Sequence, residues 1–175
     1  MNSNTSTTGS SAPVANGLLP GLIRQFIQLA GRIPNTVLAF VARFSIAAVF
    51  WKSGQTKIQG FALDIVNGEF SLGWPHLSDS VVDLFRDEYR LPLISPEAAA
   101  TLAAFAEHLL PILLLLGIAT RLSALGLFGM TLTIQFLVYP DAYPTHGTWM
   151  AVLLYLMMHG PGKLSVDHWI ARRFL

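Results

Sequence analysis

The chain has 175 residues, of which 53% are hydrophobic and only 12% are charged, with a formal net charge of +1. Ordinary soluble domains contain about 25% charged residues, so this composition indicates a chain whose solvent includes lipid. The small net charge argues against a nucleic-acid partner, and no stretch interleaves basic with aromatic residues. Because the sequence has no cysteine, any redox role requires a cofactor from elsewhere.

The N-terminal region divides into two parts. Residues 1–17 are rich in Ser, Thr, Asn and Gly, and we expect a disordered cytoplasmic tail because too few apolar groups offset the entropy of ordering. In residues 18–33 the apolar positions recur at helical spacing, with Arg24 and Arg32 elsewhere on the helix. This pattern predicts an interfacial amphipathic helix. The alternative is an extension of the first span, which Pro34 would interrupt.

Apolar segments of membrane-spanning length follow. Each is close to the roughly 20 residues that a helix needs to cross the hydrocarbon core of a bilayer. Lipid requires every backbone polar group to be satisfied, and no alternation typical of a membrane β-barrel is found. We therefore predict an all-α integral membrane protein, a four-transmembrane-helix bundle with interfacial helices at both ends. The transmembrane domain is residues 34–164, with spans at about 35–56, 97–120, 121–139 and 148–164.

The segments outside the spans have their own predicted structure. The outer connection, residues 57–96, contains a short helical pattern that Ser80 would cap, and this helix would lie over the mouth of the bundle. Residues 98–106, at the start of the second span, are rich in alanine, which lets helix backbones approach closely in lipid. Residues 165–175 are predicted to form a cytoplasmic juxtamembrane helix.

The positions of lysine and arginine predict the orientation. One side of the membrane would carry Arg24, Arg32, Arg121, Lys163, Arg172 and Arg173. The other side would carry the connection 57–96, which is rich in Asp and Glu, and the turn 140–147, which has no Lys or Arg. Basic residues concentrate on the cytoplasmic side of membrane proteins, so both termini are expected in the cytoplasm.

Several polar side chains fall within the predicted spans, where they are costly and therefore either paired or functional. At a rise of ~1.5 Å per residue they form two layers at different depths. The upper layer, toward the outer face, contains Lys52, Glu107, His108 and Gln135, and the lower layer contains Arg43 and His159.

A pair between Lys52 and Glu107 would build a small polar pocket between the spans, open to the outer face. Pro111 adds to this prediction, because a proline inside a helix kinks it and frees the carbonyl of Glu107. Glu107 has two interpretations: a paired carboxylate that fixes helix packing, or a group that binds a ligand or handles a proton. Arg43 is interpreted as a snorkelling or helix-pairing residue, whereas His159 fits either an interfacial position or a pocket.

No metal site and no catalytic residue are predicted. The sequence places no two of His146, His159 and His168 at the i, i+3 or i+4 spacing of helical metal ligands. It also contains no nucleophile-elbow motif and no glycine-rich phosphate loop that precedes a helix.

Several segments of the chain together resemble the DoxX family of small bacterial membrane proteins. The segments that carry the likeness are FAEHLLPILLLLGIATRLSAL (105–125), Arg43 with WKSGQTK (51–57), YRLPLISP (89–96) and GPGKLSVD (160–167). The resemblance covers about residues 33–174.

The resemblance implies a four-span protein of the bacterial inner membrane, in which Arg43 and Glu107 match recurring positions without an assigned catalytic role. Some relatives are linked to thiosulfate:quinone oxidoreduction, and another is described as the membrane partner of superoxide-detoxifying and sulfur-handling enzymes. The absence of cysteine argues against a thiol relay here. We therefore expect a membrane subunit of a redox or oxidative-stress system, with a soluble or membrane redox partner protein. Quinone is the candidate ligand, near Glu107, Lys52 and Gln135.

Two other functions stay open at this stage. The chain fits a non-catalytic scaffold that anchors a soluble partner through residues 18–33 and 165–175. A small-solute carrier has less support, because the sequence shows no internal repeats or paired broken helices, although an oligomer would change that argument. The sequence assigns neither an enzymatic activity nor an oligomeric state.

Overall fold

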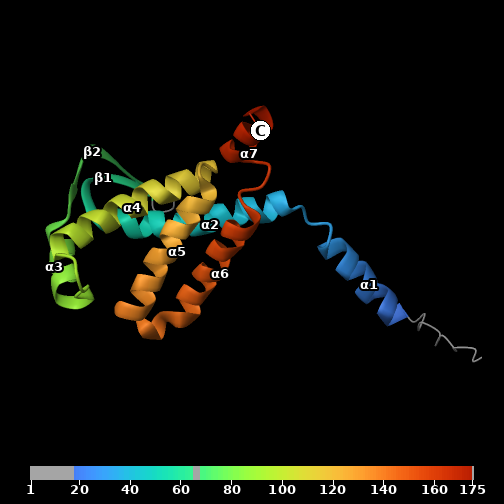
Figure 1. The fold of residues 1–175 in the computed structure, drawn as a ribbon, viewed down its shortest axis with the longest axis horizontal. Helices are drawn as coiled ribbons and strands as arrows, with labels where there is room; N and C mark the ends of the chain where they lie inside the picture. The colour runs from blue at the N-terminus through green and yellow to red at the C-terminus, as the bar shows by residue number, and fades with distance from the viewer. Residues whose placement is uncertain (1–17, 65–67, 175) are drawn as a thin grey trace, which may run out of the picture. The chain divides into compact units, whose positions relative to one another are not determined.

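The computed structural model describes residues 18–64 and 68–174, and the chain forms two compact units, Met1–Pro34 and Asn35–Leu175 (Figure 1). In the first unit, helix α1 (Leu18–Ala30) confirms the helical pattern expected for residues 18–33. Its large apolar side chains, including Leu22 and Phe26, are exposed. Its position on lipid headgroups stays a prediction, and the tail predicted for residues 1–17 lies outside the described residues.

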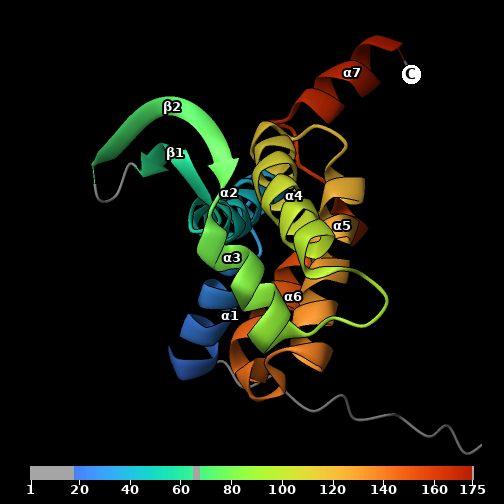
Figure 2. The ribbon, with the colours of Figure 1, turned by 90° about the vertical axis from the view of Figure 1, so that its left-hand side faces the viewer.

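The second unit is built around a bundle of four helices (Figures 1 and 2). They are α2 (Asn35–Gln55), α4 (Pro96–Leu116), α5 (Thr120–Leu137) and α6 (Tyr143–His159). Helix α2 packs against α4 and α6, and α5 packs against the same two helices. The shared core contains Ile46, Phe50, Leu114, Leu127, Leu153 and Leu156.

Within the described residues, α2 and α4 are the helices long and apolar enough to cross a membrane. This agrees with the spans predicted at about 35–56 and 97–120. Helix α5 has 18 residues and α6 has 17, which correspond to about 27 and 25 Å at ~1.5 Å per residue. That these two helices also cross the membrane stays a prediction.

Small residues allow close contact between α2 and α4. Ala104 of α4 is buried, and at the start of this helix Ala100 is buried against the connection described below. Near the end of α2, a Cβ added to Gly54 would lie 2.9 Å from Cε1 of His108 and 3.0 Å from the carbonyl oxygen of Glu107. Glycine at position 54 therefore brings the backbone of α2 directly against these two residues of α4.

Helix α6 differs in position from the fourth predicted segment. The structure begins it at Tyr143 and ends it at His159, whereas the sequence pattern placed the segment at about 148–164. Pro144 is tolerated because the first turn of a helix needs no N–H donor there. The helix ends before Gly160, which has a φ of 74° and is followed by Pro161. The expected extension to residue 164 is therefore wrong.

The connection between α2 and α4 contains a β-hairpin that the sequence analysis missed (Figure 2). Strand β1 (Ile58–Asp64) pairs antiparallel with β2 (Glu69–Leu77), with an irregular register near Gln59. The sequence signal was the alternation of Phe70, Leu72 and Trp74 with smaller or polar residues. This signal is weak because Gly73 and Pro75, which disfavour strands, lie within the same segment. The side chains of Phe70, Leu72 and Trp74 are exposed.

The predicted short helix in this connection is present, but it begins earlier than expected. Helix α3 (Asp79–Leu84) has Ser78 at its N-cap position rather than Ser80, and it continues into the π-helix η1 (Phe85–Tyr89). Val81 and Phe85 are buried against Ala99 and Ala100 at the start of α4. The connection is thereby tied to the outer end of α4 by apolar packing.

The turn between α4 and α5 meets the C-terminal segment. Helix α4 ends at Leu116 rather than about residue 120, because Gly117 takes a left-handed conformation with a φ of 70°. Helix α7 (Val166–Phe174) agrees with the helix predicted for residues 165–175, whereas its place beside the membrane stays a prediction, and the hydroxyl of Ser165 accepts a hydrogen bond of 3.2 Å from the backbone N–H of His168. A Cβ at Gly117 would overlap Ser165 and the guanidinium of Arg43.

We expect Gly117→Ala to lower the Tm of the detergent-solubilised protein, at a cost of roughly 1–3 kcal/mol from backbone strain, with steric overlap in addition. Gly129→Ala is the matched control, because an added Cβ there meets no atom within 4 Å and alanine favours the helix. Its Tm should be unchanged or higher. Equal Tm values for the two variants would contradict the tight packing inferred at Gly117.

Candidate functional site

A buried ion pair joins the turn that follows α2 to the middle of α4. Nζ of Lys57 lies 2.7 Å from Oε2 of Glu107, and the two side chains are 7% and 3% exposed. Lys57 also donates to the carbonyl oxygen of Ser53 at 3.3 Å and to its hydroxyl at 3.1 Å. The approach to Oε2 lacks good hydrogen-bond alignment, so this contact rests mainly on charge and proximity. The ammonium and carboxylate compensate each other where water is excluded.

The expected pairing of Glu107 with Lys52 is wrong. Lys52 is exposed, and the lysine that reaches Glu107 is Lys57, just beyond the end of α2. The reason is geometric: on a helix Lys52 points about 200° away from Gly54, which faces α4. The turn after the helix, closed by a 2.9 Å bond from the N–H of Lys57 to the carbonyl of Gly54, folds Lys57 back over Ser53.

His108 lies next to this ion pair and links α4 to the hairpin. Its Nε2 is 2.9 Å from Nε2 of Gln55, and its Nδ1 is 2.7 Å from the carbonyl oxygen of Ala104. Gln55 accepts a 2.7 Å bond from the backbone N–H of Leu63 through Oε1, so its NH₂ group must face the histidine. Nε2 of His108 therefore accepts, and Nδ1 carries the proton that is donated to Ala104. The imidazole in this arrangement is neutral.

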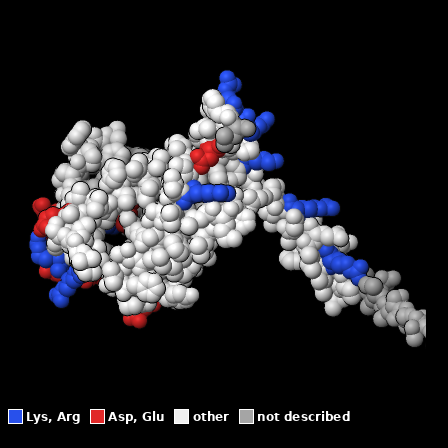
Figure 3. Space-filling model, viewed as in Figure 1, with Lys and Arg blue, Asp and Glu red and all other residues white. Residues whose placement is uncertain are grey.

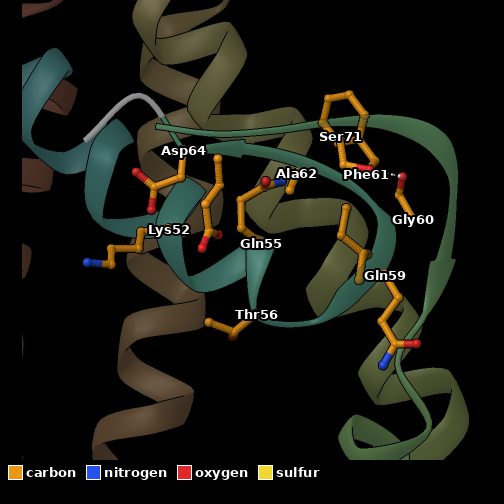
Figure 4. Close-up of a pocket in the computed structure, with 11 residues that line it drawn as sticks. Lys52, Gln55, Thr56, Gln59, Gly60, Phe61, Ala62, Asp64 and Ser71 are labelled. Carbon is orange, nitrogen blue, oxygen red and sulfur yellow. Dashed lines mark hydrogen bonds between the residues drawn. The ribbon is translucent and has the colours of Figure 1, made fainter. Parts of the chain in front are cut away.

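The hairpin covers a pocket of 240 Å³ at the end of α2 (Figure 4). The charged and amide side chains that line it are Lys52, Gln55, Gln59, Asp64 and Glu69. In Figure 4, Lys52 and Asp64 lie on one side and Gln59 on the other. Gln55 belongs both to this pocket and to the hydrogen bond with His108, whereas Glu107 is not among the lining residues. The polar pocket therefore lies next to His108 of the predicted upper layer, and Gln55 contacts both.

Gln135 belongs to a separate polar contact. Its Nε2 donates to the carbonyl of Pro140 at 2.6 Å, and its Oε1 accepts from Nδ1 of His146 at 2.8 Å. The ring of Trp149 lies 5.1 Å from that of His146. The expectation that Gln135 would join Glu107 is wrong, because this side chain ties α5 to α6 instead. His146 is buried, and the signal that could have revealed its role was the need of Gln135 for a partner.

Pro111 leaves one backbone carbonyl of α4 without a helical hydrogen bond. It is buried inside α4 and has no N–H, so the carbonyl of Glu107 receives no helical hydrogen bond. This carbonyl is the atom that closely approaches Gly54 of α2. The predicted free carbonyl thus lies at the contact between the two helices.

A group of aromatic residues lies over the outer end of α4. The ring centroids of Tyr89 and Phe85 are 4.6 Å apart, and those of Tyr89 and Tyr139 are 5.7 Å apart. The hydroxyl of Tyr139 donates to the carboxylate of Glu88, and this bond is the main cause that raises the pKa of Tyr139. Burial raises the pKa of Tyr89, and the charges of Glu107 and Glu88 add to it. Both phenols therefore stay protonated at neutral pH.

Arg43 of the predicted lower layer is a buried connector, with 1% of its surface exposed. Its Nη1 lies 3.4 Å from the carbonyl oxygen of Leu114 and 3.3 Å from that of Leu115, and Nη2 donates to the carbonyl of Leu164. These donors add to the hydrogen bonds at the end of α4, where the carbonyl of Leu114 also accepts from the backbone N–H of Gly117. Helix pairing is therefore the correct interpretation and snorkelling is wrong.

His159 does not share a layer with Arg43. Its side chain is exposed, and its ring stacks on Tyr155 with centroids 4.8 Å apart. Helix α6 ends at His159, which places the imidazole at the surface of the bundle rather than in its core. The structure places His159 among the lining residues of a surface pocket that is described below, and its position at the membrane interface stays a prediction.

Asp167 is a structural residue that the sequence analysis did not single out. Its carboxylate accepts from the backbone N–H of Ala119 at 2.8 Å and from that of Thr120 at 2.9 Å. Its own N–H donates to the carbonyl of Gly117 at 2.9 Å. The side chain thus caps the start of α5 from a position far along the chain. The segment 160–167, noted above for its likeness to a family, holds the C-terminal end against the bundle.

A family model described as DoxX matches residues 38–140. The chain belongs to the DoxX family. The matched range contains Arg43, Lys57 and Glu107, whereas His146 and Asp167 lie beyond it. Family membership and the two long apolar helices α2 and α4 support a membrane protein. Comparison with curated proteins and with solved structures gave no match.

For this DoxX-family chain, we expect Lys57→Met and Glu107→Leu each to destabilise the protein by about 3–5 kcal/mol, because each leaves a buried charge without its partner. The double variant should recover most of that loss. Chemical unfolding in detergent measures the three free energies. Lys52→Met, at the exposed lysine of the same helix, is the control and should leave stability unchanged. Single variants as stable as the control would refute a stabilising pair.

Proposed function

We propose that this protein is a membrane subunit of a redox or oxidative-stress system and binds a quinone, or a similar apolar molecule with polar oxygens, beside Lys57 and Glu107. The observation that carries this proposal is the buried ion pair between two apolar helices. Burying such charges costs free energy, so their presence favours a role beyond packing. Lys57 would donate a hydrogen bond to a quinone oxygen, and Glu107 would exchange the proton that accompanies reduction. The electrons would come from a redox partner protein.

The hairpin pocket offers the route by which a ligand would reach this pair. Gln55 lines the pocket and contacts His108, the neighbour of Glu107. The pocket volume of 240 Å³ is below the ~300–1,000 Å³ of typical small-molecule sites. A ring-sized ligand would therefore require the hairpin to move away from the end of α2. Side-chain hydrogen bonds hold the hairpin to the end of α2, including the 3.0 Å bond from Nε1 of Trp51 to the carbonyl oxygen of Leu63.

We also propose that all four helices of the bundle cross a bacterial inner membrane, with both termini in the cytoplasm. Basic side chains support this orientation: Arg121 and Lys163 line a pocket where α5 begins, and Arg172 and Arg173 follow on α7. Figure 3 shows basic groups around α7 and mixed charges at the other end of the bundle. Such an asymmetry is typical of cytoplasmic ends.

A second function, a non-catalytic scaffold, is favoured by one specific observation. The ammonium of Lys57 is engaged by Glu107 and Ser53, and both ring nitrogens of His108 have protein partners. A ligand would have to displace these contacts. In the scaffold function, the ion pair only holds helices together, and a soluble partner binds the exposed apolar and basic side chains of α1 and α7.

Mass spectrometry of the gently purified protein tests the quinone proposal. We expect co-purified quinone in the wild type and in Lys163→Gln, a lysine outside the hairpin pocket, and its loss in Glu107→Gln. The double variant Lys57→Met/Glu107→Leu guards against a folding defect, since it should be folded and yet lack the ligand. A quinone-free wild type, or quinone retained by the double variant, would overturn the proposal. Partner binding that disappears when α7 is deleted, but survives in the double variant, would support the scaffold.

Labelling of introduced cysteines tests the orientation, because the natural sequence has none. In bacterial spheroplasts, an impermeant maleimide should modify Ser71→Cys in the exposed strand β2 and should not modify Arg173→Cys on α7 until the membrane is opened. The opposite pattern would invert the proposed topology, and labelling of both sites would exclude it.

A further inference from the structure

A second pocket, with a volume of 560 Å³, lies at the start of α2, at the opposite end of this helix from Lys57. Its walls come from the start of α2, the start of α5, the segment after α6, and α7. The basic side chains that line it are Arg121, His159, Lys163 and His168. The volume falls within the ~300–1,000 Å³ of sites that hold small molecules. This pocket has no part in the quinone proposal.

The positive charges of this pocket are not neutralised by the protein. Asp167 is the acidic residue among its lining residues, and both of its oxygens accept backbone N–H groups of α5. In the part of the chain that the structure describes, no carboxylate lies within 4.0 Å of Arg121 or Lys163. The guanidinium of Arg121 makes one long bond, 3.4 Å from Nη2 to the carbonyl of Met158. Most of its donors are therefore available to a ligand.

A buried hydroxyl in the wall of this pocket also lacks a hydrogen-bond partner among the described residues. Thr120 is fully buried and lines the pocket, and its Oγ1 has no hydrogen-bond partner among the described residues. A buried polar atom without a partner is costly. A ligand oxygen bound in the pocket, after a small adjustment of this side chain, would remove that cost. Leu122, Pro161 and Ala171 add apolar surface to the walls.

We propose that this pocket binds a phosphate-bearing anion, either the headgroup of an anionic phospholipid or a free phosphate. Arginine presents several N–H donors in a planar fork that matches phosphate oxygens, and lysine adds a second positive charge. Basic pockets between membrane helices on the cytoplasmic side hold the headgroups of anionic lipids. In the proposed topology, the pocket lies at the level of these headgroups, because α2 begins and α6 ends there. The apolar walls suit the glycerol part of a lipid.

Titration of the full-length protein in detergent, followed by native mass spectrometry, tests this site. The probes are short-chain phosphatidylglycerol, phosphatidylcholine of the same chain length, glycerol 3-phosphate and inorganic phosphate. We expect phosphatidylglycerol to bind and phosphatidylcholine to bind more weakly. Arg121→Gln/Lys163→Gln should weaken phosphatidylglycerol binding about 25-fold, since each charge near a headgroup contributes about fivefold. Arg172→Gln/Arg173→Gln removes the same charge from α7 outside the pocket and should change binding much less.

The outcomes separate the sources of the phosphate. Binding of phosphatidylglycerol without binding of the soluble phosphates identifies a lipid site, whereas competition by either soluble phosphate identifies a site for the free anion; both support the proposal. Equal binding of the two lipids, or equal losses in the two double variants, would overturn it. If the Arg121→Gln/Lys163→Gln protein does not fold, Lys163→Gln alone decides, with about a fivefold loss expected. The Lys163 side chain makes no hydrogen bond or ion pair within the described residues.

Discussion

The ion pair between Lys57 and Glu107 is the constraint on which the arrangement of α2, α4 and the hairpin depends. To reach the carboxylate, Lys57 must fold back immediately after α2, and the chain then leaves directly into strand β1. The close approach of α2 and α4 at Gly54 brings the two residues into range. A buried charge without a partner is far more costly than a buried ion pair. The turn, the hairpin and the contact between the two helices are therefore stabilised together. The polar pocket beneath the hairpin is a consequence of this arrangement.

Polar side chains serve different purposes at different depths of the bundle. Arg43 supplies donors to the end of α4, and Asp167 supplies acceptors to the start of α5, so both satisfy backbone groups that helix ends leave open. Gln135 and His146 satisfy each other between α5 and α6. A buried polar group without such a partner would be costly. Arg121 and Lys163 differ from these residues because their charges stay available at the surface.

Part of this architecture could be predicted because it rests on local pattern. The apolar runs of α2 and α4, the alanine-rich helix contact and the start of α7 follow from composition and spacing. Glu107 could be recognised as a key residue because a carboxylate inside an apolar run is costly to bury and is therefore paired or functional. The hairpin did not follow from the alternation of Phe70, Leu72 and Trp74, because this pattern is short and includes residues that disfavour strands. The end of α6 differs from the prediction because Gly160 and Pro161 stop the helix before residue 164.

The sequence by itself determined that this is a membrane chain of the DoxX family, with apolar helices and a costly carboxylate at position 107. Only the tertiary structure decided which lysine neutralises that carboxylate, since Lys52 and Lys57 are near in sequence but lie on different sides of the end of α2. It also decided that Gln135 pairs with His146. The physical reason is that helical spacing gives the relative direction of side chains on one helix, whereas partners on other helices depend on how each helix is rotated and where it ends.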